Sequence, residues 1–430
     1  MKRVLIITYY WPPNGGAGVY RWLKFSKYLP EHGWKPVVYT PSNPELTADD
    51  PGLLRDVHPD IEMVQRPISE PYTLYKRLTG RKVHEKVETA FLNEQKRKSW
   101  REDLALWVRS NFFVPDARVG WVRPSIAFLK DYLREHPVDA IITTGPPHSM
   151  HLIGLGLKRR LGVKWIADFR DPWTDIDFYQ QLKLTGWADR RHRRRERSVL
   201  ESADRVVTVS WSWAKDLERL GARDVQVITN GFDPADVPSP PVAVDDVWSL
   251  VHLGAMSATR DCPALWERLS ALCKSDPVFG SKFKLRFLGP VDHSILTSIT
   301  SAGLMDKVER LGRVSHDEAM REMQRARVLL LPINDTPNMQ GILPGKLFEY
   351  LGVGRPILAV GPATGDVVRV LGDGHLRLDR ELSPKDDARI LAFFQDSDRP
   401  HAGSIERFSR KTLAGEVASL LNEVAAKGTN

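Results

Sequence analysis

The feature that most limits the fold of this sequence is an alternation, repeated in both halves, of short apolar runs with longer segments of helical period. The first run, residues 4–8, leads through a loop to apolar residues at positions 19, 22, 23 and 29, the spacing of one helix face. Similar runs occur at 36–40, 140–143, 164–168 and 205–210, and again at 248–253, 284–288, 308–311, 328–332 and 356–360. Strands that alternate with helices form parallel, doubly wound sheets, so the sequence predicts an α/β protein.

Length and proline content divide this alternation into two domains. The chain has 430 residues, about three times the ~150 residues of a typical domain. A proline-rich stretch predicts a linker at 233–246, between an N-terminal domain at 1–232 and a C-terminal domain at 247–404. The alternation lapses at about 50–116, which we interpret as a basic, helical insertion. The helical period at 405–424 is compatible with a helix that packs back on the first domain.

Composition excludes several classes of protein. Hydrophobic residues make up 42% and charged residues 27% of the chain, as in a globular and not a disordered protein. No apolar run approaches the ~20 residues of a membrane span, and the apolar start at 4–7 is better interpreted as a buried strand than as a signal peptide. The two cysteines, Cys262 and Cys273, cannot build a disulfide framework and suit a reducing compartment, so we expect a cytoplasmic protein.

The net charge of +8 favours an acidic partner. A phosphorylated substrate, an anionic membrane surface or both would fit this charge. It is moderate for 430 residues, so we expect no nucleic-acid partner. The twelve histidines are scattered without the spacing of metal ligands.

A glycine-rich loop, residues 12–18, joins the first strand to the first helix. Such a loop lets backbone N–H groups and a helix N-terminus approach an anion, or it is only a tight turn that needs glycine. The loop lacks two features of a dinucleotide-binding site. Arg21 stands at the third glycine position, and the second strand ends at Thr40 without an acidic residue for the ribose.

The most informative stretch is residues 341–356, GILPGKLFEYLGVGRP. Pro344 suits the first position of a helix and Gly352 suits its exit. Lys346 and Glu349 are three residues apart, so they lie on one face of this helix near its N-terminus. The cation suits a diphosphate there and the carboxylate suits a sugar diol, although the spacing also fits an ordinary surface ion pair.

This stretch resembles the donor-site signature of retaining nucleotide-sugar glycosyltransferases of family four, which have the GT-B fold. The resemblance covers nearly the whole chain, including the Pro-Pro-x-Gly-Gly loop, Asn-Gly-x-Asp at 230–233 and the loop at 254–260. It implies two Rossmann-like domains that face each other across a cleft. It also implies an enzyme of bacterial polysaccharide or glycan biosynthesis.

The resemblance implies roles for individual residues. Glu349 matches the carboxylate that holds the donor ribose, and Lys346 and Arg260 match basic positions near the donor diphosphate. Gly15 and Gly16 match the loop whose backbone faces the phosphate and the sugar.

Two family positions differ in this chain. The first Glu of the family's Glu-x7-Glu motif falls at Gly341, so the hydroxyls of the transferred sugar need another partner. Gln340 is one candidate, and the backbone N–H groups of Ile342 and Leu343 are the other. Ala255 stands where the family often has an arginine, so Arg260 would act without that second cation.

Polar residues follow two strands of the first domain at the edge where α/β sites lie. His148 comes after the strand at 140–143, in the area where the resemblance places an active-site histidine. Asp171 is a candidate acceptor base and Arg170 a candidate anion contact. Alternatively, His148 or Asp171 caps a helix, and Arg170 forms a structural ion pair with Asp168.

The function implied by the resemblance is transfer of a sugar from a nucleoside-diphosphate sugar to a glycan or lipid-linked acceptor, with retention at the anomeric carbon. The C-terminal domain would bind the donor and the N-terminal domain the acceptor. No Asp-x-Asp motif occupies a suitable loop, so we expect no metal and no other cofactor. Instead, Arg260, Lys346 and helix N-termini would stabilise the departing diphosphate. The alternatives are a GT-B sugar-nucleotide epimerase and, because Gly341 replaces a carboxylate, a non-catalytic nucleotide-sugar-binding paralogue.

Aromatic and basic residues gather in the first half of the chain. Eleven of the thirteen tryptophans precede Asn230, and six arginines lie between Arg190 and Arg197. We expect peripheral contact with an anionic membrane, at its inner face, through the basic insertion and its aromatic residues. Core packing of the aromatics and a solvated arginine helix are the alternatives. The aromatic residues concerned are Trp100, Trp107, Phe112 and Phe113.

Overall fold

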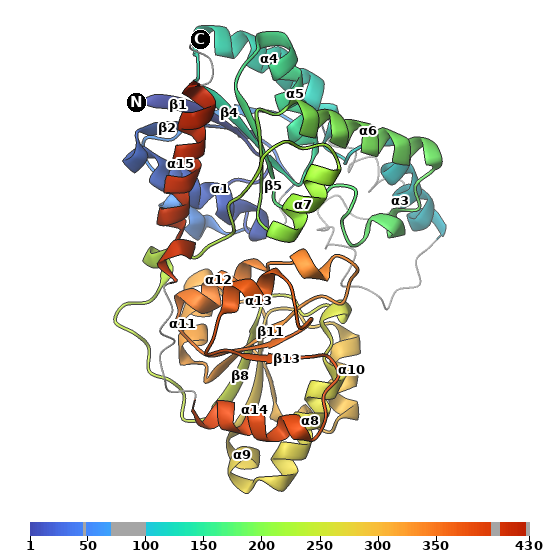
Figure 1. Ribbon diagram of the computed structural model, residues 1–430, viewed down its shortest axis with the longest axis vertical. Helices are drawn as coiled ribbons and strands as arrows, with labels where there is room; N and C mark the ends of the chain where they lie inside the picture. Colours follow the sequence, from blue (N-terminus) through green and yellow to red (C-terminus); the bar gives the residue numbers. More distant parts are fainter. Residues whose placement is uncertain (46–48, 70–99, 397–404, 427–430) are drawn as a thin grey trace. The chain divides into compact units, whose positions relative to one another are not determined.

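The computed structural model describes residues 1–45, 49–69, 100–396 and 405–426 (Figure 1). The chain divides into two compact units. The N-terminal unit holds the described residues up to Thr229 together with those from Arg410 onward, and the C-terminal unit holds those from Asn230 to Ser409. Each unit contains one sheet of parallel strands, as the alternating sequence pattern predicts.

The sheet of the N-terminal unit has seven parallel strands in the order β3-β2-β1-β4-β5-β6-β7. Its strands are β1 (Lys2–Ile7), β2 (Trp34–Pro41), β3 (Glu62–Arg66), β4 (Ala140–Gly145), β5 (Trp165–Phe169), β6 (Arg205–Thr208) and β7 (Val225–Val227). Its helices are α1 (Ala17–Tyr28), α3 (Trp100–Phe112), α4 (Val122–Glu135), α5 (Ser149–Leu161), α6 (Gly186–Ser202), α7 (Trp211–Arg219) and α15 (Arg410–Ala426).

Alternate side chains of these strands supply two cores, one on each face of the sheet. Val4 and Ile6 of β1 belong to the core that includes apolar residues of α1 and α15. Leu5 and Ile7 belong to the opposite core, with residues of α4, α5, α6 and α7. The C-terminal helix α15 thus completes one layer of the N-terminal unit, where it lies beside α1 (Figure 1).

Two strands of this unit lie outside the predicted pattern. Residues 62–66 form the edge strand β3, so the interpretation of the interval 50–116 as a helical insertion is wrong for them. β3 has only two apolar residues among its five and none of the five is buried, and β7 has only three residues. Neither strand therefore shows the continuous apolar run of a buried parallel strand. Residues 70–99 of the predicted insertion lie outside the described residues.

The C-terminal unit repeats this topology with six parallel strands in the order β10-β9-β8-β11-β12-β13. Its strands are β8 (Trp248–Leu253), β9 (Phe283–Leu288), β10 (Val308–Arg310), β11 (Val328–Pro332), β12 (Ile357–Val360) and β13 (Leu376–Leu378). Its helices are α8 (Pro263–Ser275), α9 (Pro277–Lys282), α10 (His293–Ser301), α11 (His316–Arg325), α12 (Gly345–Gly352), α13 (Asp366–Leu371) and α14 (Lys385–Gln395).

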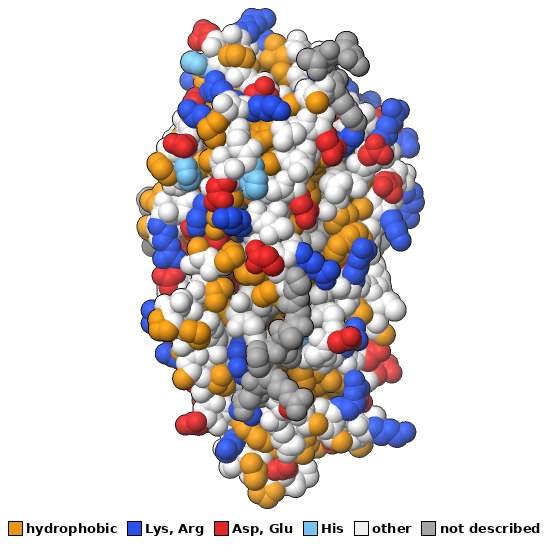
Figure 2. Space-filling model, turned by 60° about the vertical axis from the view of Figure 1, so that its left-hand side comes forward, with side chains coloured by type: hydrophobic (Ala, Val, Ile, Leu, Met, Phe, Trp, Pro, Cys, Tyr) orange, Lys and Arg blue, Asp and Glu red, His pale blue; other side chains and the backbone are white. Residues whose placement is uncertain are grey.

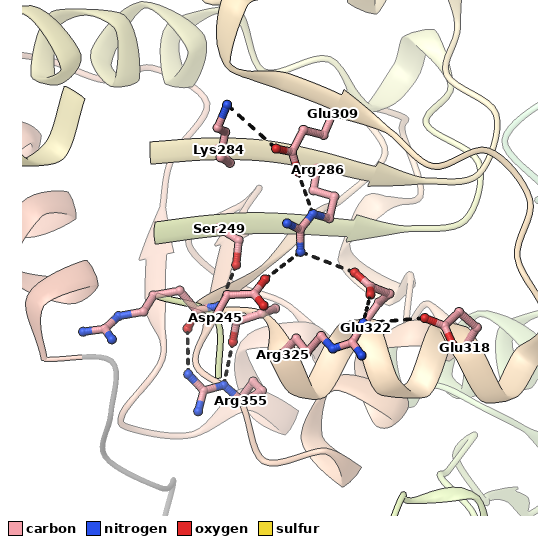
Figure 3. Close-up of polar contacts among 11 residues, drawn as sticks. Asp245, Ser249, Lys284, Arg286, Glu309, Glu318, Glu322, Arg325 and Arg355 are labelled. Atoms are coloured by element: carbon pink, nitrogen blue, oxygen red, sulfur yellow. Dashed lines mark hydrogen bonds and ion pairs between the residues drawn. The ribbon is translucent and has the colours of Figure 1, made fainter. Parts of the chain in front are cut away.

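A network of charges fastens one edge of the second sheet (Figure 3). The guanidinium of Arg286 on β9 contacts Asp245 at 2.7 Å, Glu309 at 2.9 Å and Glu322 at 3.3 Å. Asp245 lies just before β8, at the amino-terminal end of that strand. Ligands of parallel α/β sheets bind beyond the carboxyl ends of the strands, so we assign this network a structural role.

One face of the surface carries mixed charge. On the face drawn in Figure 2, Lys and Arg side chains are interspersed with Asp and Glu. Within the described residues, no helix combines the length and the apolar character that crossing a membrane requires.

Candidate active site

The predicted site residues gather at the carboxyl ends of the strands in both units. In the N-terminal unit the chain order reverses between β1 and β4, and in the C-terminal unit between β8 and β11. Ligands of doubly wound sheets bind at such switch points because the loops from the two strands diverge there. Each unit therefore offers a candidate half-site. The one after β8 and β11 is predicted to bind the donor (the donor half-site), and the one after β1, β4 and β5 is predicted to bind the acceptor (the acceptor half-site).

Arg260 is held in the loop that follows β8. Its Nε donates to the Asn334 side chain oxygen at 2.7 Å, and its Nη1 donates to the carbonyl oxygen of Ala255 at 2.7 Å. Asn334 follows β11, so the guanidinium ties together the loops on either side of the switch point. The residue that occupies the missing arginine position, Ala255, thus serves through its backbone to orient the arginine that is present.

Lys346 lies in the first turn of α12 and points back to β8. Its Nζ is 3.1 Å from Nε2 of His252, a fully buried residue of that strand. The other ring nitrogen of His252, Nδ1, lies 3.2 Å from the carbonyl oxygen of Leu330, which can only accept. Nδ1 therefore carries the proton, and Nε2 accepts from Lys346.

The electrostatics of this half-site favour an anion. Burial lowers the pKa of Lys346 well below its usual range, and the charge of Arg260 lowers this pKa further, whereas Glu349 opposes the shift. Burial also lowers the pKa of His252, followed by the charges of Lys346 and Arg260. A diphosphate bound beside Lys346 and Arg260 would offset the burial and the repulsion that lower the pKa of the lysine.

Tyr350 fixes the position of α12 against the sheet. Its hydroxyl accepts from the backbone N–H of Leu253 at 2.9 Å and donates to the carbonyl oxygen of Leu330 at 3.3 Å. These contacts join the helix to the end of β8 and to the middle of β11. Lys346 and Glu349, on the same helix, are therefore placed by the strands and not by a loose loop.

The segment before α12 contains the position where the family carboxylate is missing. Gly341 is buried, and the N–H of Ile342 donates to the carbonyl oxygen of Met339 at 3.2 Å. The Ile342 N–H is thus already engaged in a turn. Gln340 accepts from the Thr364 hydroxyl at 3.3 Å beside Gly365, and a Cβ at Gly365 would lie 2.7 Å from the Gln340 side chain oxygen.

In the N-terminal unit, the predicted glycine loop joins β1 to α1. Gly16 is the N-cap residue of α1, with φ of 98°, a conformation that favours glycine. It is exposed, so the N-terminus of α1 is open to an anion, while its neighbour Gly15 is buried.

Arg170 acts as a clamp in this half-site. Its Nη1 donates to the carbonyl oxygen of Gly18 at 2.7 Å, and its other donors reach the carbonyl oxygens of Gly145 and Pro146. It therefore ties the first turn of α1 to the loop after β4. Three of its five N–H groups are used in this way, and burial lowers its pKa.

Asp168 is paired with Arg21 and not with Arg170. The fully buried carboxylate accepts from Arg21 at 2.9 Å, from the Trp22 indole at 2.7 Å and from the Thr144 hydroxyl at 2.9 Å. The alternative of an Arg170–Asp168 pair is therefore wrong. Arg21, the residue at the third glycine position of the excluded dinucleotide pattern, serves this buried pair.

His148 precedes α5 but does not cap it. It makes no capping hydrogen bond, and Asp116 accepts from the Ser149 N–H at 2.9 Å instead. The His148 ring stacks on the indole of Trp173, with centroids 5.0 Å apart and an interplanar angle of 9°. Burial lowers the pKa of His148 well below its usual range, followed by the effect of His151.

His151 shares the surroundings of His148. The Thr143 hydroxyl accepts from the Trp165 indole at 2.9 Å and forms a second hydrogen bond, with Nδ1 of His151, at 2.8 Å. A Cβ added at Gly145 would lie 2.6 Å from Nε2 of His151 and 2.9 Å from Nδ1 of His148. Only glycine fits at this position because both rings approach it. Neither of these two nitrogens has a hydrogen-bond partner in the described part of the chain.

Asp171 is half-buried beside Arg170. Burial raises the pKa of the Asp171 carboxyl, Asp177 and Asp168 add to this effect, and Arg170 opposes it. A raised pKa strengthens a carboxylate as a base, which fits the predicted role toward an acceptor hydroxyl.

Sequence reasoning missed several residues of these half-sites. His252 and His151 lie within patterns that are typical of an apolar strand or helix, and Trp173 is one of eleven tryptophans before Asn230. A histidine or tryptophan within or near a predicted element is too common to mark a site. Asn334 gave no signal, since it follows β11 in an unpatterned loop.

Solved structures similar to this chain match over its full length. Sucrose-phosphate synthase from Thermosynechococcus elongatus gives a TM-score of 0.61 at 14% identity and covers 100% of both chains. A glycosyltransferase from Rickettsia africae gives 0.63 at 13% identity, covering 100% of this chain and 99% of that chain. HepE of Anabaena, solved in complex with UDP, gives 0.58 at 15% identity, covering 98% and 100%. At these identities the likeness shows the fold alone, and it confirms the predicted GT-B fold with two Rossmann-like domains.

The family comparison agrees with the predicted resemblance. The model of Glycosyltransferase Family 4 matches residues 14–236, just over half of the chain. No match was found among curated proteins. The matched segment contains Gly15, Gly16, His148, Arg170 and Asp171. The chain is a glycosyltransferase of the GT-B type and belongs to glycosyltransferase family 4.

Proposed function

We propose that this glycosyltransferase moves a sugar from a nucleoside-diphosphate sugar to a glycan or lipid-linked acceptor, with retention and without a metal. The observation that supports this most is the pair of Arg260 and Lys346 after β8 and β11. Two neighbouring cations, one with a strongly lowered pKa, fit a diphosphate better than any neutral ligand.

In this proposal the donor half-site stabilises the leaving group. As the bond from the anomeric carbon to the diphosphate breaks, negative charge develops on the phosphate oxygen. Arg260 and Lys346 are fixed before the reaction begins, which is the condition under which charged groups lower a barrier most effectively. They would perform the task that a divalent metal performs in other transferases. Glu349 would hold the ribose hydroxyls.

In the same proposal the acceptor half-site provides the attacking hydroxyl. His148 and Asp171 would position this hydroxyl, and the Asp171 carboxylate would accept its proton. The new bond forms on the face from which the diphosphate leaves, so the anomeric configuration is kept. Exposed Gly16 at the start of α1 would add backbone N–H groups toward the donor phosphate.

The proposed acceptor class is inferred from the positive charge of the protein and of its surface. HepE of Anabaena was solved with UDP, and WaaG is described as a glycosyltransferase of lipopolysaccharide biosynthesis, with a TM-score of 0.52 and 14% identity to this chain. The net charge of +8 and the arginine-rich α6 support an acceptor at an anionic membrane. A lipid-linked sugar would be presented at such a surface.

The test begins with a thermal-shift screen of nucleoside-diphosphate sugars against the full chain. The sugar that stabilises most is then supplied, isotopically labelled, with lipid-linked and soluble glycan acceptors in EDTA. We expect a glycoside product whose NMR coupling shows the donor's anomeric configuration. An inverted product, or activity that EDTA abolishes and magnesium restores, would contradict the mechanism. Conversion of the donor sugar without an acceptor would instead identify an epimerase, and binding without turnover a non-catalytic paralogue.

A further inference from the structure

Helix α3 exposes four large apolar side chains to solvent. Leu104, Trp107, Val108 and Phe112 recur at intervals of three and four, so they form one stripe along the helix. Phe112 is 60% exposed and Leu104 51% exposed. The Trp107 and Phe112 rings contact each other edge to face, with centroids 6.1 Å apart. An apolar stripe of this kind normally faces a core, and its exposure marks an interaction surface.

Helix α6 carries a complementary stripe. Trp187, Arg190, Arg191 and Arg194 follow the same spacing of three and four, opposite the buried residues of the helix. Trp187 is 53% exposed, and the guanidinium of Arg191 lies 5.0 Å from the centre of its ring. The aromatic and cationic groups of this stripe are therefore presented together.

One buried residue holds the two helices side by side. Asn111, on α3, accepts from the backbone N–H of Thr185 at 2.6 Å and donates to the carbonyl oxygen of Lys183 at 3.5 Å. Thr185 in turn caps α6 by accepting from the Ala188 N–H. The helices lie next to each other in the N-terminal unit (Figure 1). The two stripes therefore keep a fixed position relative to each other.

The charge of this surface is largely uncompensated. Arg190 and Arg194 make no ion pair with any residue that the structure describes, whereas Arg193, off the stripe, is bound by Asp189 at 3.1 Å. On α3, Asp103 is an exposed acid. The eight residues of the two stripes include three arginines and no acidic residue, so the stripes are positively charged around their exposed aromatic rings.

We propose that Leu104, Trp107, Val108 and Phe112 of α3 with Trp187, Arg190, Arg191 and Arg194 of α6 form a docking face for an anionic lipid bilayer. Tryptophan and phenylalanine favour the boundary between headgroups and acyl chains, and arginines beside them bind the phosphate of anionic lipids. The two chemistries match the two layers that a bilayer surface presents. A soluble anion would engage the arginines but leave the apolar stripe in water.

This inference deepens the proposed function, since it names the surface by which the enzyme would reach a lipid-linked acceptor. The test is sedimentation of the full chain with vesicles of phosphatidylcholine alone or with phosphatidylglycerol, at low and high salt. We expect binding only to vesicles that contain the anionic lipid, weakened by salt. Replacing Arg190, Arg191 and Arg194 by Ala should weaken binding by about a hundredfold. Trp107→Ser with Phe112→Ser should weaken it even at low salt, because the apolar contact is lost.

Matched variants separate this face from charge in general. Arg123→Ala, Lys130→Ala and Arg160→Ala remove the same charge from the basic pocket between α4 and α5, and they should leave vesicle binding nearly unchanged. Equal losses in both triple variants would overturn the docking face, as would no binding of the wild type to anionic vesicles. Nucleotide-sugar binding, followed by thermal shift in the same variants, should stay at the wild-type level. If the wild type itself binds no nucleotide sugar, that result counts against the proposed function and not against the docking face.

Discussion

The side chain nitrogen of Lys346 lies 3.1 Å from Nε2 of the buried His252, which accepts a hydrogen bond from it. A lysine so placed keeps its proton with difficulty, because burial and the nearby Arg260 both disfavour its charge. A diphosphate beside it would restore the charge. We therefore expect this pair to respond to a bound anion as well as to hold it.

Donor binding should depend on pH through this pair. The pKa of Lys346 is lowered in the free protein and should rise when a diphosphate binds, so the protonated form binds more tightly. Affinity should be constant at acid pH and should fall as the pH rises through the free-protein pKa of Lys346. Calorimetry in buffers of different ionisation enthalpy should show proton uptake on binding. Lys346→Arg, whose charge persists, should remove this pH dependence, and an unchanged profile in that variant would contradict the assignment.

Removal of either cation should slow transfer. Lys346→Ala and Arg260→Ala each delete a fixed charge beside the leaving diphosphate, and we expect losses of about 2–4 kcal/mol in kcat/KM. Arg310→Ala, which removes an exposed arginine from the same unit, is the matched control and should have little effect. Glu349→Gln should weaken donor binding more than it lowers kcat. Wild-type kinetics in both alanine variants would refute the donor half-site.

The stack on His148 should matter for the acceptor half-site. Trp173 covers the His148 ring and donates from its indole to Nδ1 of His192 at 3.0 Å. Trp173→Leu should lower kcat about tenfold or more with nucleotide affinity unchanged, as should His148→Ala and Asp171→Asn. Trp173→Phe keeps the stack and should recover most of the activity. If these variants lose nucleotide binding while they stay folded, the division of labour between the units is wrong.

Glu196 should make stability depend on pH. This buried carboxyl accepts from Thr174, and burial raises its pKa from 4.5 to about 7. Because the pKa is raised in the folded state, the stabilising contribution is complete below about pH 4.5 and is lost as the pH rises through about 7. Glu196→Gln should abolish this loss, which amounts to about 3 kcal/mol. Urea unfolding at pH 5 and pH 8 measures this change in the free energy of unfolding, with Glu201→Gln, at an exposed position, as the control. A parallel decline in wild type and Glu196→Gln would refute the prediction.

Much of the fold was predictable because buried parallel strands have continuous apolar runs in their sequence. The runs at 248–253 and 328–332 coincide with β8 and β11. Edge strands such as β3 carry polar residues on their open side, so they lack that pattern. The ends of a strand can therefore be predicted from the sequence where both faces of the strand are buried.

The site was less predictable than the fold. Lys346 gives a signal because it lies in the first turn of a helix whose proline and glycine boundaries are visible in the sequence, and Arg260 was predicted from the family resemblance. The residues that interact with Lys346 and Arg260 give no such signal in the sequence. His252 reads as part of an apolar strand, and its contact with Lys346 joins positions 94 residues apart. Likewise, the pairing of Asp168 with Arg21 instead of Arg170 depends on how β5 and α1 are placed, which sequence spacing does not give.

The most direct test of this account measures the affinity of the full chain for a nucleoside diphosphate, the matching monophosphate and the nucleoside by isothermal titration. We expect the diphosphate to bind much more tightly than the monophosphate, Lys346→Ala and Arg260→Ala to lose most of this difference, and His148→Ala to keep it. Equal affinity for the diphosphate and the monophosphate, or a Lys346→Ala variant that still discriminates between them as the wild type does, would contradict it.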